Sequence, residues 1–535
     1  MGSTRSIRAA LALAAVLLVA ACGGTDEDAS DGAEVLDRGL GAEPESLDPH
    51  KSRSLQAGHV QRDLGEGLTG YSAAGELEPR AAESWDISAD GRTYTFHLRA
   101  AARWSNGEPV TAANFVYSFR RLVDPETAAF YSQSVSAIEN APAILAGDLP
   151  PDALGVSAPE PLTLVVRLTD ATPYFLALLT HPSMFPVYRG SVESDDTYTL
   201  PGRFVTNGAY RLVRWDVGSL IELERNELYW DTAHTAIPEV RWHIAPEPLA
   251  EVNRYRAGEL NVTDTVPPEV FAKLREERPG ELHVSPYLAV YYYGFNLTRP
   301  PFKDNPLLRQ ALSMAIDREV LTGKIIGRGE APAYSWVPPG IANYTSQRPT
   351  WADLPREERH ARAQAIYAQA GYGPDHPAQV EIRYNTSETH QRIALAVQSM
   401  WRDVLGVETT LVNEEFQVLL SNMRAKKVTE VFRSSWTGDY DDAHTFLHVM
   451  TSDAPSNMTG YTSEEFDALM RRAAGETDPA RRRDFMQQAE AVLLADYPVV
   501  PLYFYVSKHL VNPRIEGWSD NVLDYHYSQH LSFAP

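Results

Sequence analysis

The chain has 535 residues, of which 44% are hydrophobic, and a formal net charge of −23 from 48 Lys and Arg against 71 Asp and Glu. This acidic balance argues against a nucleic-acid-binding protein, which needs a basic surface. A chain of this length cannot bury its apolar residues in a single core, so we expect two or three domains.

The N-terminal segment has the pattern of an export signal. Arg5 and Arg8 precede an apolar run at residues 9–21, which is shorter than the ~20 residues needed to cross a bilayer. Cys22, the single cysteine of the chain, follows small residues in the manner of a bacterial lipobox. We therefore expect residues 1–21 to be a signal peptide and residues 22–34 to be a lipidated cysteine with an acidic tether.

The alternative is that Cys22 is only a small residue beside a cleavage site. If Cys22 is lipidated, the mature body has no free thiol. A disulfide, a cysteine nucleophile and a thiolate metal site are then all excluded.

The first predicted elements lie between residues 85 and 122. Residues 85–98 alternate polar and apolar side chains around Asp90-Gly91 and predict a β-hairpin. Thr111 then suits the N-cap of a helix that carries Phe115, Phe119 and Leu122 on one face.

Helix and strand patterns alternate through the rest of the chain. Residues 162–168 and 219–224 predict strands, and residues 306–316 predict a helix with Pro306 in its first turn. Residues 392–405 predict an amphipathic helix, and the spacing of Thr462 to Glu465 predicts a capping box that begins another. The sequence thus indicates a mixed α/β protein of several domains, without internal repeats.

Several motifs occur in a fixed order along the chain. The one after the first predicted hairpin is WSNGEPVTA at residues 104–112. The others are SLDPH at 46–50, NGAY at 207–210, ERN at 224–226, NRYRAGE at 253–259, AIDR at 315–318, YNTS at 384–387, WTGDY at 436–440 and VPLYFY at 500–505. Through them the chain resembles the peptide and nickel solute-binding proteins (solute-binding protein family 5). Its C-terminal third is most similar to the oligopeptide-binding members of enteric bacteria.

This resemblance implies an α/β protein with the type II periplasmic-binding-protein-like fold (cluster C). In that fold two lobes close on a ligand about a hinge, and a third domain extends one lobe. On this chain the matched motifs assign residues 35–65, 189–288 and 507–535 to lobe I, 66–188 to an extra domain II, and 289–506 to lobe III.

The resemblance also implies a function in transport. The protein is expected to be a monomer that captures short oligopeptides and delivers them to the permease subunits of an ABC importer. It is expected in the periplasm or at the cell surface, held to a membrane through its lipid anchor, with no cofactor and no enzyme activity.

Four charged side chains match family positions that hold the ends of a peptide. Asp439 matches an aspartate that pairs with the α-ammonium of the ligand. Arg433 and His390 match groups that meet its carboxylate, for which a guanidinium is suited because it donates two parallel hydrogen bonds. Lys324 is the candidate for ligands of another length. Without the resemblance, each would be read as an ordinary surface side chain.

Aromatic residues match the positions that line the family's cleft. They are Tyr131, Trp436, Tyr505 and Phe416, although the family pattern has a larger indole where this chain has Phe416. Aromatic walls tolerate many ligands because they offer apolar area with few directional demands. The alternative for each is core packing.

Tyr287 and residues 291–293 lie where the chain is expected to cross between the lobes, but the sequence does not indicate which of these tyrosines face a ligand. Arg53 is a departure from the enteric pattern, which has an acidic residue close to the first ligand positions. We therefore expect less tolerance for cationic residues at the N-terminal end of the peptide, and better acceptance of acidic ones.

Other ligands and another class of function stay open at this point. Murein tripeptide presents a similar backbone and similar charged ends. Nickel or haem is less favoured because an aspartate and arginine pair suits a zwitterion; a metal site would use the cluster Asp439, Asp441, Asp442 and His444. A secreted hydrolase is the alternative from another class, but HExxH, GxSxG and a complete phosphate loop are absent from the sequence.

Overall fold

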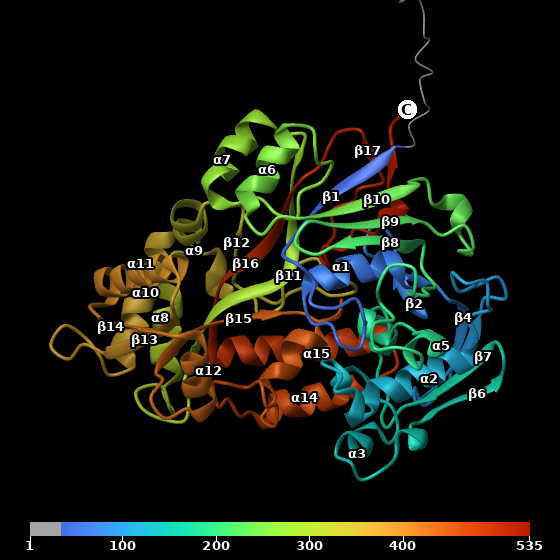
Figure 1. The fold of residues 1–535 in the computed structure, drawn as a ribbon. Coiled ribbons are helices and arrows are strands. Elements are labelled where there is room, and N and C mark those ends of the chain that lie inside the picture. The colour runs from blue at the N-terminus through green and yellow to red at the C-terminus, as the bar shows by residue number, and fades with distance from the viewer. Residues whose placement is uncertain (1–33) are drawn as a thin grey trace, which may run out of the picture. The chain divides into compact units, whose positions relative to one another are not determined.

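Three large β-sheets organise the part of the chain that the structure describes, and its two longest strands lie side by side in one of them (Figure 1). The structure is a computed structural model that describes residues 34–535. Residues Val35–Pro535 form one compact unit. The predicted signal peptide and the predicted lipidation at Cys22 lie outside the described residues.

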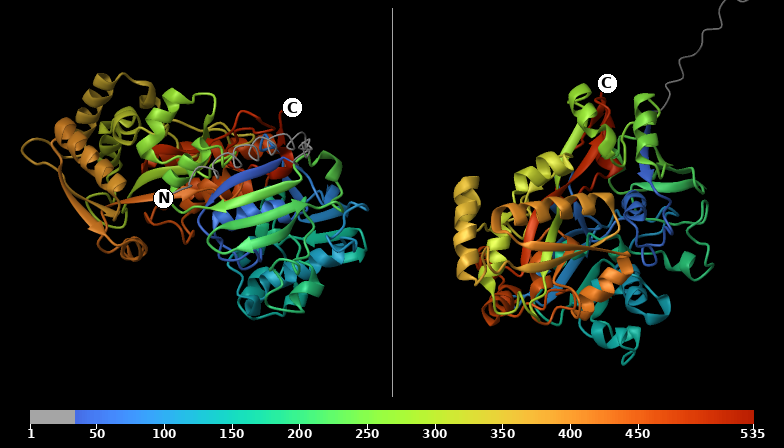
Figure 2. Two further views of the ribbon diagram at one scale, coloured as in Figure 1. Left: turned by 45° about the horizontal axis from the view of Figure 1, so that its top comes forward. Right: turned by 90° about the vertical axis from the view of Figure 1, so that its left-hand side faces the viewer.

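The first sheet has four strands in the order β1-β10-β9-β8 and is seen in the left view of Figure 2. The strands are β1 (Val35–Gly41), β8 (Tyr210–Asp216), β9 (Leu220–Arg225) and β10 (Glu239–Ile244). β1 pairs with β10 in parallel, and the other pairs are antiparallel. Helix α1 (Leu55–Leu64) packs against β1 and β8. The strand predicted at 219–224 is confirmed as β9.

The second sheet is antiparallel, with the order β4-β5-β7-β6. Its strands are β4 (Ala82–Ile87), β5 (Thr93–Leu98), β6 (Val156–Glu160) and β7 (Thr163–Arg167). β4 and β5 confirm the predicted hairpin, and Gly91 takes a φ of +70° in its turn, a conformation that glycine adopts without strain. β7 confirms the strand predicted at 162–168.

Helix α2 (Ala112–Val123) packs against β6 and β7 and confirms the helix predicted after Thr111. Asn114 holds its first turn: Asn114 Oδ1 accepts hydrogen bonds from the Thr111 amide at 2.7 Å and from the buried Trp104 Nε1 at 3.3 Å. The WSNGEPVTA motif is thus connected to the helix that follows it.

The third sheet has six strands in the order β12-β16-β11-β15-β13-β14. They are β11 (Leu282–Phe295), β12 (Ala331–Pro332), β13 (Gln379–Asn385), β14 (Glu408–Glu414), β15 (Val431–Thr437) and β16 (Val499–Leu510). β11 is antiparallel to both β15 and β16, whereas β13 is parallel to β14 and β15.

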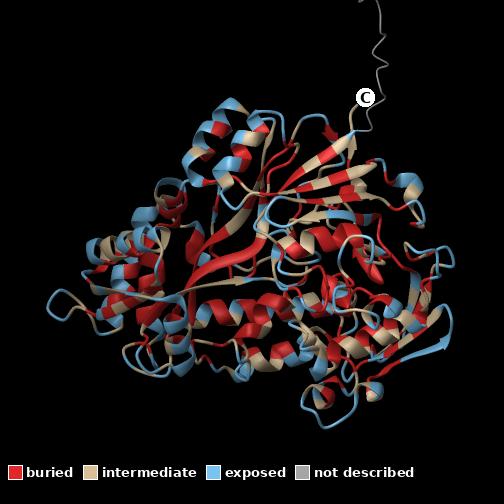
Figure 3. Ribbon diagram, in the orientation of Figure 1, coloured by how far each residue is buried: buried red, intermediate tan, exposed pale blue. Residues whose placement is uncertain are grey.

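Helices cover both faces of this sheet, so its central strands are largely buried (Figure 3). On one face Tyr291 and Tyr293 join a core with α8 (Pro306–Ala315), α10 (Arg356–Gln369) and α11 (Glu388–Leu405). On the other face Val290 and Tyr292 join a core with α13 (His444–Leu447), α14 (Glu464–Gly475) and α15 (Pro479–Asp496). Successive residues of β11 therefore enter different cores, as the period of a strand requires.

Shorter elements complete the described chain. Helices α6 (Pro248–Arg256) and α7 (Pro268–Glu277) share a small core with Leu510. Two small sheets are β2 (Thr69–Tyr71) with β3 (Leu77–Pro79) and β17 (Ile515–Glu516) with β18 (Ser532–Phe533). The remaining α-helices are α3 (Ala141–Leu145), α4 (Phe175–Leu178), α5 (Arg189–Val192), α9 (Arg318–Val320) and α12 (Phe416–Ala425), and a π-helical turn (Leu321–Ile326) follows α9.

Helix starts are where the predictions need correction. α8 matches the helix predicted at 306–316, but α11 begins about one turn before the predicted start at residue 392, because the Ser387 hydroxyl caps it by accepting from the His390 amide. The prediction that a capping box at Thr462 begins a helix is wrong. The Ser463 hydroxyl, one residue later, accepts from the Phe466 amide at 3.3 Å and starts α14 at Glu464.

No helix within residues 34–535 combines the length and the apolar character needed to cross a membrane. Each of the three large sheets is built mainly from one of the three predicted parts of the chain. Strands β11 and β16 continue across the predicted boundaries at residues 288 and 506. The division into lobe I, domain II and lobe III stays a proposal.

Candidate functional site

Segments that are far apart in the sequence enclose a cavity of about 950 Å³. Its walls come from the start of α1, from residues 130–137 and 174–181, from the centre of β11, from β15 and the loop after it, from β16, and from residues 523–525. This volume lies in the range of roughly 300–1,000 Å³ that is usual for small-ligand sites. The cavity is therefore large enough for a ligand of several residues.

Four of the predicted site residues line this cavity: Arg53, Tyr131, Asp439 and Tyr505. Arg53 precedes α1, Tyr131 lies in a loop after α2, Asp439 follows β15, and Tyr505 belongs to β16. The Tyr131 hydroxyl donates a 3.3 Å hydrogen bond to the Arg53 carbonyl, so two of these residues also contact each other. The structure brings together groups separated by several hundred residues.

Asp439 presents a carboxylate to the cavity. Its backbone amide donates to Thr445 Oγ1 at 3.1 Å, but its carboxylate has no hydrogen bond or ion pair with any residue in the described part of the chain. The surrounding walls raise the pKa of this carboxyl by limiting its hydration, and the nearby His448 partly opposes that effect. Such a carboxylate is suited to pair with a cationic group of a ligand.

Gly438 allows the loop that carries Asp439 to turn closely over α13. A Cβ at this position would lie 2.9 Å from side-chain atoms of both Phe446 and Thr445. The Gly438 amide also donates to the Leu288 carbonyl at 2.8 Å, which extends the pairing of β11 and β15. The glycine of the WTGDY motif thus has a packing role that places the aspartate after it.

A column of stacked rings forms the wall beside Asp439. Tyr174 stacks on both Tyr440 and His444, with ring centroids 4.9 Å and 4.3 Å away, and His444 stacks on His448 at 5.0 Å. His181 and Tyr131, which also line the cavity, pack edge to face with ring centroids 4.6 Å apart. Sequence reasoning missed Tyr174, His181 and His448 as lining residues; the spacing of His444 and His448 on one helical face was the available signal.

Arg433 and His390 belong to a second cluster, connected to the cavity through Tyr505. Arg433 donates to Asn385 Oδ1 at 3.2 Å and to the Tyr505 hydroxyl at 3.4 Å, and its guanidinium lies 4.8 Å from the Tyr291 ring centroid. The Tyr291 hydroxyl and His390 Nδ1 are 3.2 Å apart. Burial, and then the charge of Arg433, lower the pKa of His390 to about 4, so this imidazole is neutral at neutral pH.

Besides Arg433 and His390, three more predicted site residues are not among those that line the cavity. Trp436 lies on the face of β15 opposite Arg433, packs on the core of α13–α15, and donates to the Thr445 carbonyl at 2.8 Å. Phe416 is exposed at the start of α12, and Lys324 is exposed in the π-helical turn. Of the tyrosines on β11, Tyr287 lines the cavity, whereas residues 291–293 are buried.

The alternative metal cluster of Asp439, Asp441, Asp442 and His444 does not converge on one point within the described residues. Asp442 forms a two-pronged ion pair with Arg482 at 2.7 and 2.9 Å. Asp441 lines a different cavity, of about 800 Å³, and accepts from the Ala342 amide.

Comparison with known proteins identifies the family. Residues 76–458 match the model described as bacterial extracellular solute-binding proteins, family 5 middle. The chain belongs to this family. The family resemblance seen in the sequence is thereby confirmed, and so is a function in solute binding rather than in catalysis.

Two relatives of this family 5 protein are similar over nearly the whole chain. The periplasmic oligopeptide-binding protein OppA of Escherichia coli (strain K12) is 39% identical over 503 residues, 93% of this chain and 92% of OppA. The periplasmic murein peptide-binding protein MppA of the same organism is 38% identical over 500 residues, with the same coverage of 93% and 92%.

Solved structures confirm the expected fold for this family 5 protein. The unliganded open form of the murein tripeptide binding protein MppA matches with a TM-score of 0.88, 36% identity, and coverage of 94% of this chain and 98% of MppA. OppA of Haemophilus influenzae in complex with the peptide RPPGFSPFR matches with a TM-score of 0.74, 37% identity, and coverage of 94% and 100%.

Proposed function

We propose that this protein captures short oligopeptides outside the cytoplasm and delivers them to the permease subunits of an ABC importer. The observation that carries the proposal is the Asp439 carboxylate, which faces the 950 Å³ cavity and has no hydrogen-bond or ion-pair partner within residues 34–535. A peptide offers the matching group, since its α-ammonium is a cation at one defined end. The similarity to OppA from two organisms supports the same ligand class.

The charged groups at the two ends of the site suit a zwitterionic ligand. Asp439 holds the ammonium of the peptide. Arg433 and His390 contact its carboxylate directly when the peptide has a suitable length. Arg433 is already oriented by Asn385 and Tyr505, which limits the entropy lost when it binds. Lys324, Phe416 and Trp436 stay candidates for contacts that form only around a bound ligand.

Recognition of many peptide sequences requires contacts that all peptides share. Backbone groups of a ligand can pair with an exposed strand edge, as in β-augmentation. Residues 288–289 of β11 line the cavity, and so do Ser435, Thr437 and Gly438 at the end of β15. The stacked rings of Tyr174, His444 and His448 add apolar area with few directional demands. We propose that the backbone provides affinity and the aromatic walls tolerate different side chains.

Closure of two lobes over the ligand belongs to this proposal. The structure is more similar to the unliganded open form of MppA, with a TM-score of 0.88, than to OppA in complex with a peptide, with a TM-score of 0.74. This difference supports an open state in which the lobes stand apart. Closure would then move Arg433 and His390 toward the ligand end opposite Asp439.

We also propose that Cys22 carries the lipid that holds the protein at a membrane surface. Its support is the sequence around the single cysteine of the chain. Expression of Cys22→Ser in a bacterial host tests it. We expect the variant to lose the mass of the acyl chains and to leave the membrane fraction; an unchanged membrane-bound fraction contradicts the anchor.

Calorimetry with a matched pair of peptides tests the proposed ligand class. The mature protein, freed of retained ligand by partial unfolding and refolding, is titrated with tri-alanine and with N-acetyl-tri-alanine. We expect tight binding of the free peptide and a loss of about 3 kcal/mol on acetylation, because the Asp439 carboxylate is left unpaired. Absence of binding for both peptides contradicts oligopeptide capture, and equal binding contradicts the role of Asp439 alone.

Murein tripeptide is a second candidate ligand, favoured by the 38% identity to MppA and by the structural match to its open form. It presents similar charged ends to the same groups. The same titration with murein tripeptide separates the two candidates. Binding at least ~10-fold tighter than that of tri-alanine would favour murein peptide as the ligand.

A further inference from the structure

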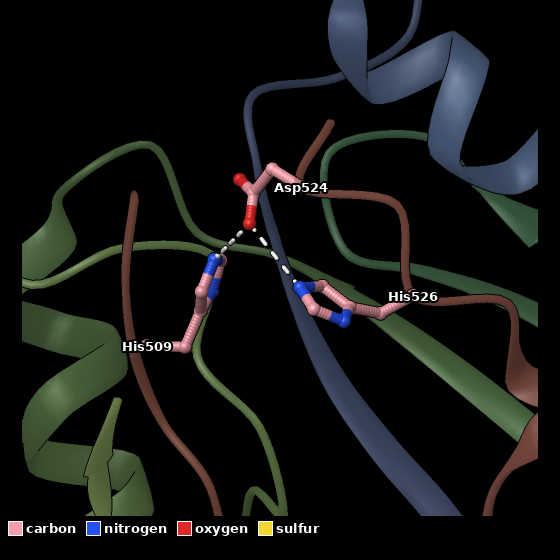
Figure 4. Close-up of side chains that lie close together, drawn as sticks. All are labelled: His509, Asp524 and His526. Atoms are coloured by element: carbon pink, nitrogen blue, oxygen red, sulfur yellow. Dashed lines mark hydrogen bonds and ion pairs between the residues drawn. The ribbon is translucent and has the colours of Figure 1, made fainter. Parts of the chain in front are cut away.

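Two histidines and an aspartate point toward one another beside β16 (Figure 4). His509 belongs to β16, whereas Asp524 and His526 belong to the C-terminal segment. Asp524 Oδ1 lies 2.9 Å from His509 Nε2 and 3.2 Å from His526 Nε2. All three potential ligand atoms lie within 4.8 Å of one another, and no other group of three within residues 34–535 meets this condition.

These separations are close to those of a tetrahedral metal site. Zn–N and Zn–O distances of ~2.0–2.1 Å put neighbouring ligand atoms ~3.3 Å apart. The two distances from Asp524 Oδ1 are shorter by only a few tenths of an ångström, a change that small rotations of the side chains provide. The two imidazole nitrogens lie within 4.8 Å of each other, so they have to approach by at most about 1.5 Å.

Neighbouring groups orient both imidazoles. His509 Nδ1 lies 2.9 Å from the Thr263 carbonyl, which can only accept, so Nδ1 carries a hydrogen and Nε2 faces Asp524. A backbone carbonyl on the far nitrogen is the usual support of a metal-bound histidine. The ring of His526 stacks on Trp518 with centroids 3.6 Å apart, which fixes the direction of its Nε2.

The charges around the three residues are mixed. Asp264 lies close enough to interact electrostatically with both His509 and Asp524, and it adds negative charge. Arg38 is the opposing cation, but its guanidinium donates to the His526 carbonyl and to Ser528 Oγ, and it faces Asp63. The side chains of His509, Asp524 and His526 are 11%, 21% and 6% exposed, so the three residues lie just below the protein surface.

We propose that His509, Asp524 and His526 form a binding site for a divalent transition metal of the Zn²⁺, Ni²⁺ or Cu²⁺ class. Two imidazoles and one carboxylate suit these ions, whereas Mg²⁺ and Ca²⁺ prefer sets of oxygen ligands. The neighbouring residues Leu523 and Tyr525 line the large cavity. A bound ion would hold the segment that carries them against β16, independently of which solute the cavity takes.

Titration of the tag-free mature protein with Zn²⁺, after treatment with a chelator and dialysis, tests the site. We expect one ion per chain and an affinity that falls at least ~10-fold in His526→Gln. His243→Gln is the matched control, since His243 Nε2 also contacts an aspartate, Asp37, at 2.6 Å but without a second imidazole. Its Zn²⁺ affinity should equal that of the original protein.

A spectroscopic measurement covers the case in which a variant does not fold. Co²⁺ in a four-coordinate site with imidazole ligands has absorption bands in the visible region, and the unmodified protein should show them at one equivalent. Absence of Zn²⁺ binding up to ~1 mM, absence of these bands, or equal Zn²⁺ affinity in His526→Gln and the original protein each overturns the proposal.

Discussion

At the scale of single residues, the proposed site depends on charges that the protein leaves available. Asp439 has no carboxylate partner among the described residues, while its neighbour Asp442 is paired with Arg482 and Asp441 accepts from the Ala342 amide. Three aspartates within one short loop therefore have three different environments. The sequence singles out Asp439 only through the family motif, whereas the structure shows that the three carboxylates differ in their hydrogen bonds and ion pairs.

Asp439→Asn should lower the affinity for tri-alanine about 100-fold, because removal of one charge leaves the ammonium of the ligand without a partner in a poorly hydrated cavity. The affinity for N-acetyl-tri-alanine should stay within a factor of about two. Calorimetry of both peptides measures this. Asp441→Asn is the control, since its carboxylate belongs to another cavity, and an equal loss in that variant would contradict the assignment.

The pKa of Asp439 predicts how affinity depends on pH. Burial raises the pKa of the free carboxyl, and a bound ammonium lowers it, so the ligand binds the ionised form. Affinity is therefore full above the raised pKa and is lost as the pH falls through it. Titration of tri-alanine amide from about pH 7 to about pH 4 should show this loss, and Asp439→Asn should show a much smaller one. The amide is used because it removes the carboxylate that His390 would meet.

Arg53 predicts a preference for the charge of the ligand. It lines the cavity together with Tyr131 and Asp439, so a peptide with Glu near its N-terminus should bind better than one with Lys. We expect a difference of about three- to tenfold, limited by solvent screening of an exposed arginine. Arg53→Glu should reverse the order. Equal affinities of Lys-Ala-Ala and Glu-Ala-Ala for the original protein would contradict the prediction.

At the scale of secondary-structure elements, short side-chain contacts decide where helices begin. Thr111, Ser387 and Ser463 each stand immediately before the first residue of a helix. The cap at Thr111 was predicted. Ser387 starts its helix one turn earlier than predicted, and Ser463 caps its helix in place of the predicted Thr462. Two adjacent hydroxyl residues offer nearly the same capping chemistry, so local sequence does not choose between them; packing of Phe466 and Leu469 into the core does.

Asn114→Ala should destabilise the protein by about 1–2 kcal/mol, as expected for loss of a helix-capping interaction. Its Oδ1 accepts from the Thr111 amide and from Trp104 Nε1, and both donors are left unpaired in the variant. Urea unfolding measures the free energy. Asn106→Ala, which removes one exposed hydrogen bond to the Glu108 amide, should cost less, and the reverse order would contradict the role of Asn114.

At the scale of the whole molecule, the long strands β11 and β16 lie side by side in the six-stranded sheet, and both contribute residues that line the cavity. Lobes that close about such crossing strands change the dimensions of the protein without unfolding either lobe. Small-angle X-ray scattering should therefore show a smaller radius of gyration at saturating tri-alanine. N-acetyl-tri-alanine at the same concentration serves as the control, and an unchanged radius at full occupancy would exclude closure.

Much of the fold and part of the candidate site were accessible from the sequence. The hairpin at 85–98 and the helix after Thr111 follow from patterns within a few residues, because the period of side chains and the caps are local properties. The ordered motifs indicated the family, and through it the residues that the structure places around one cavity: Arg53, Tyr131, Asp439 and Tyr505.

Only the tertiary structure decided which faces these elements present. Arg433 and Trp436 share the strand β15 but point to opposite faces of the sheet, and Tyr291 and Tyr292 enter different cores. The stack of Tyr174 with His444 and the approach of Thr263 to His509 join residues more than two hundred positions apart. Such contacts depend on how sheets and helices pack, and local sequence patterns carry no information about that packing.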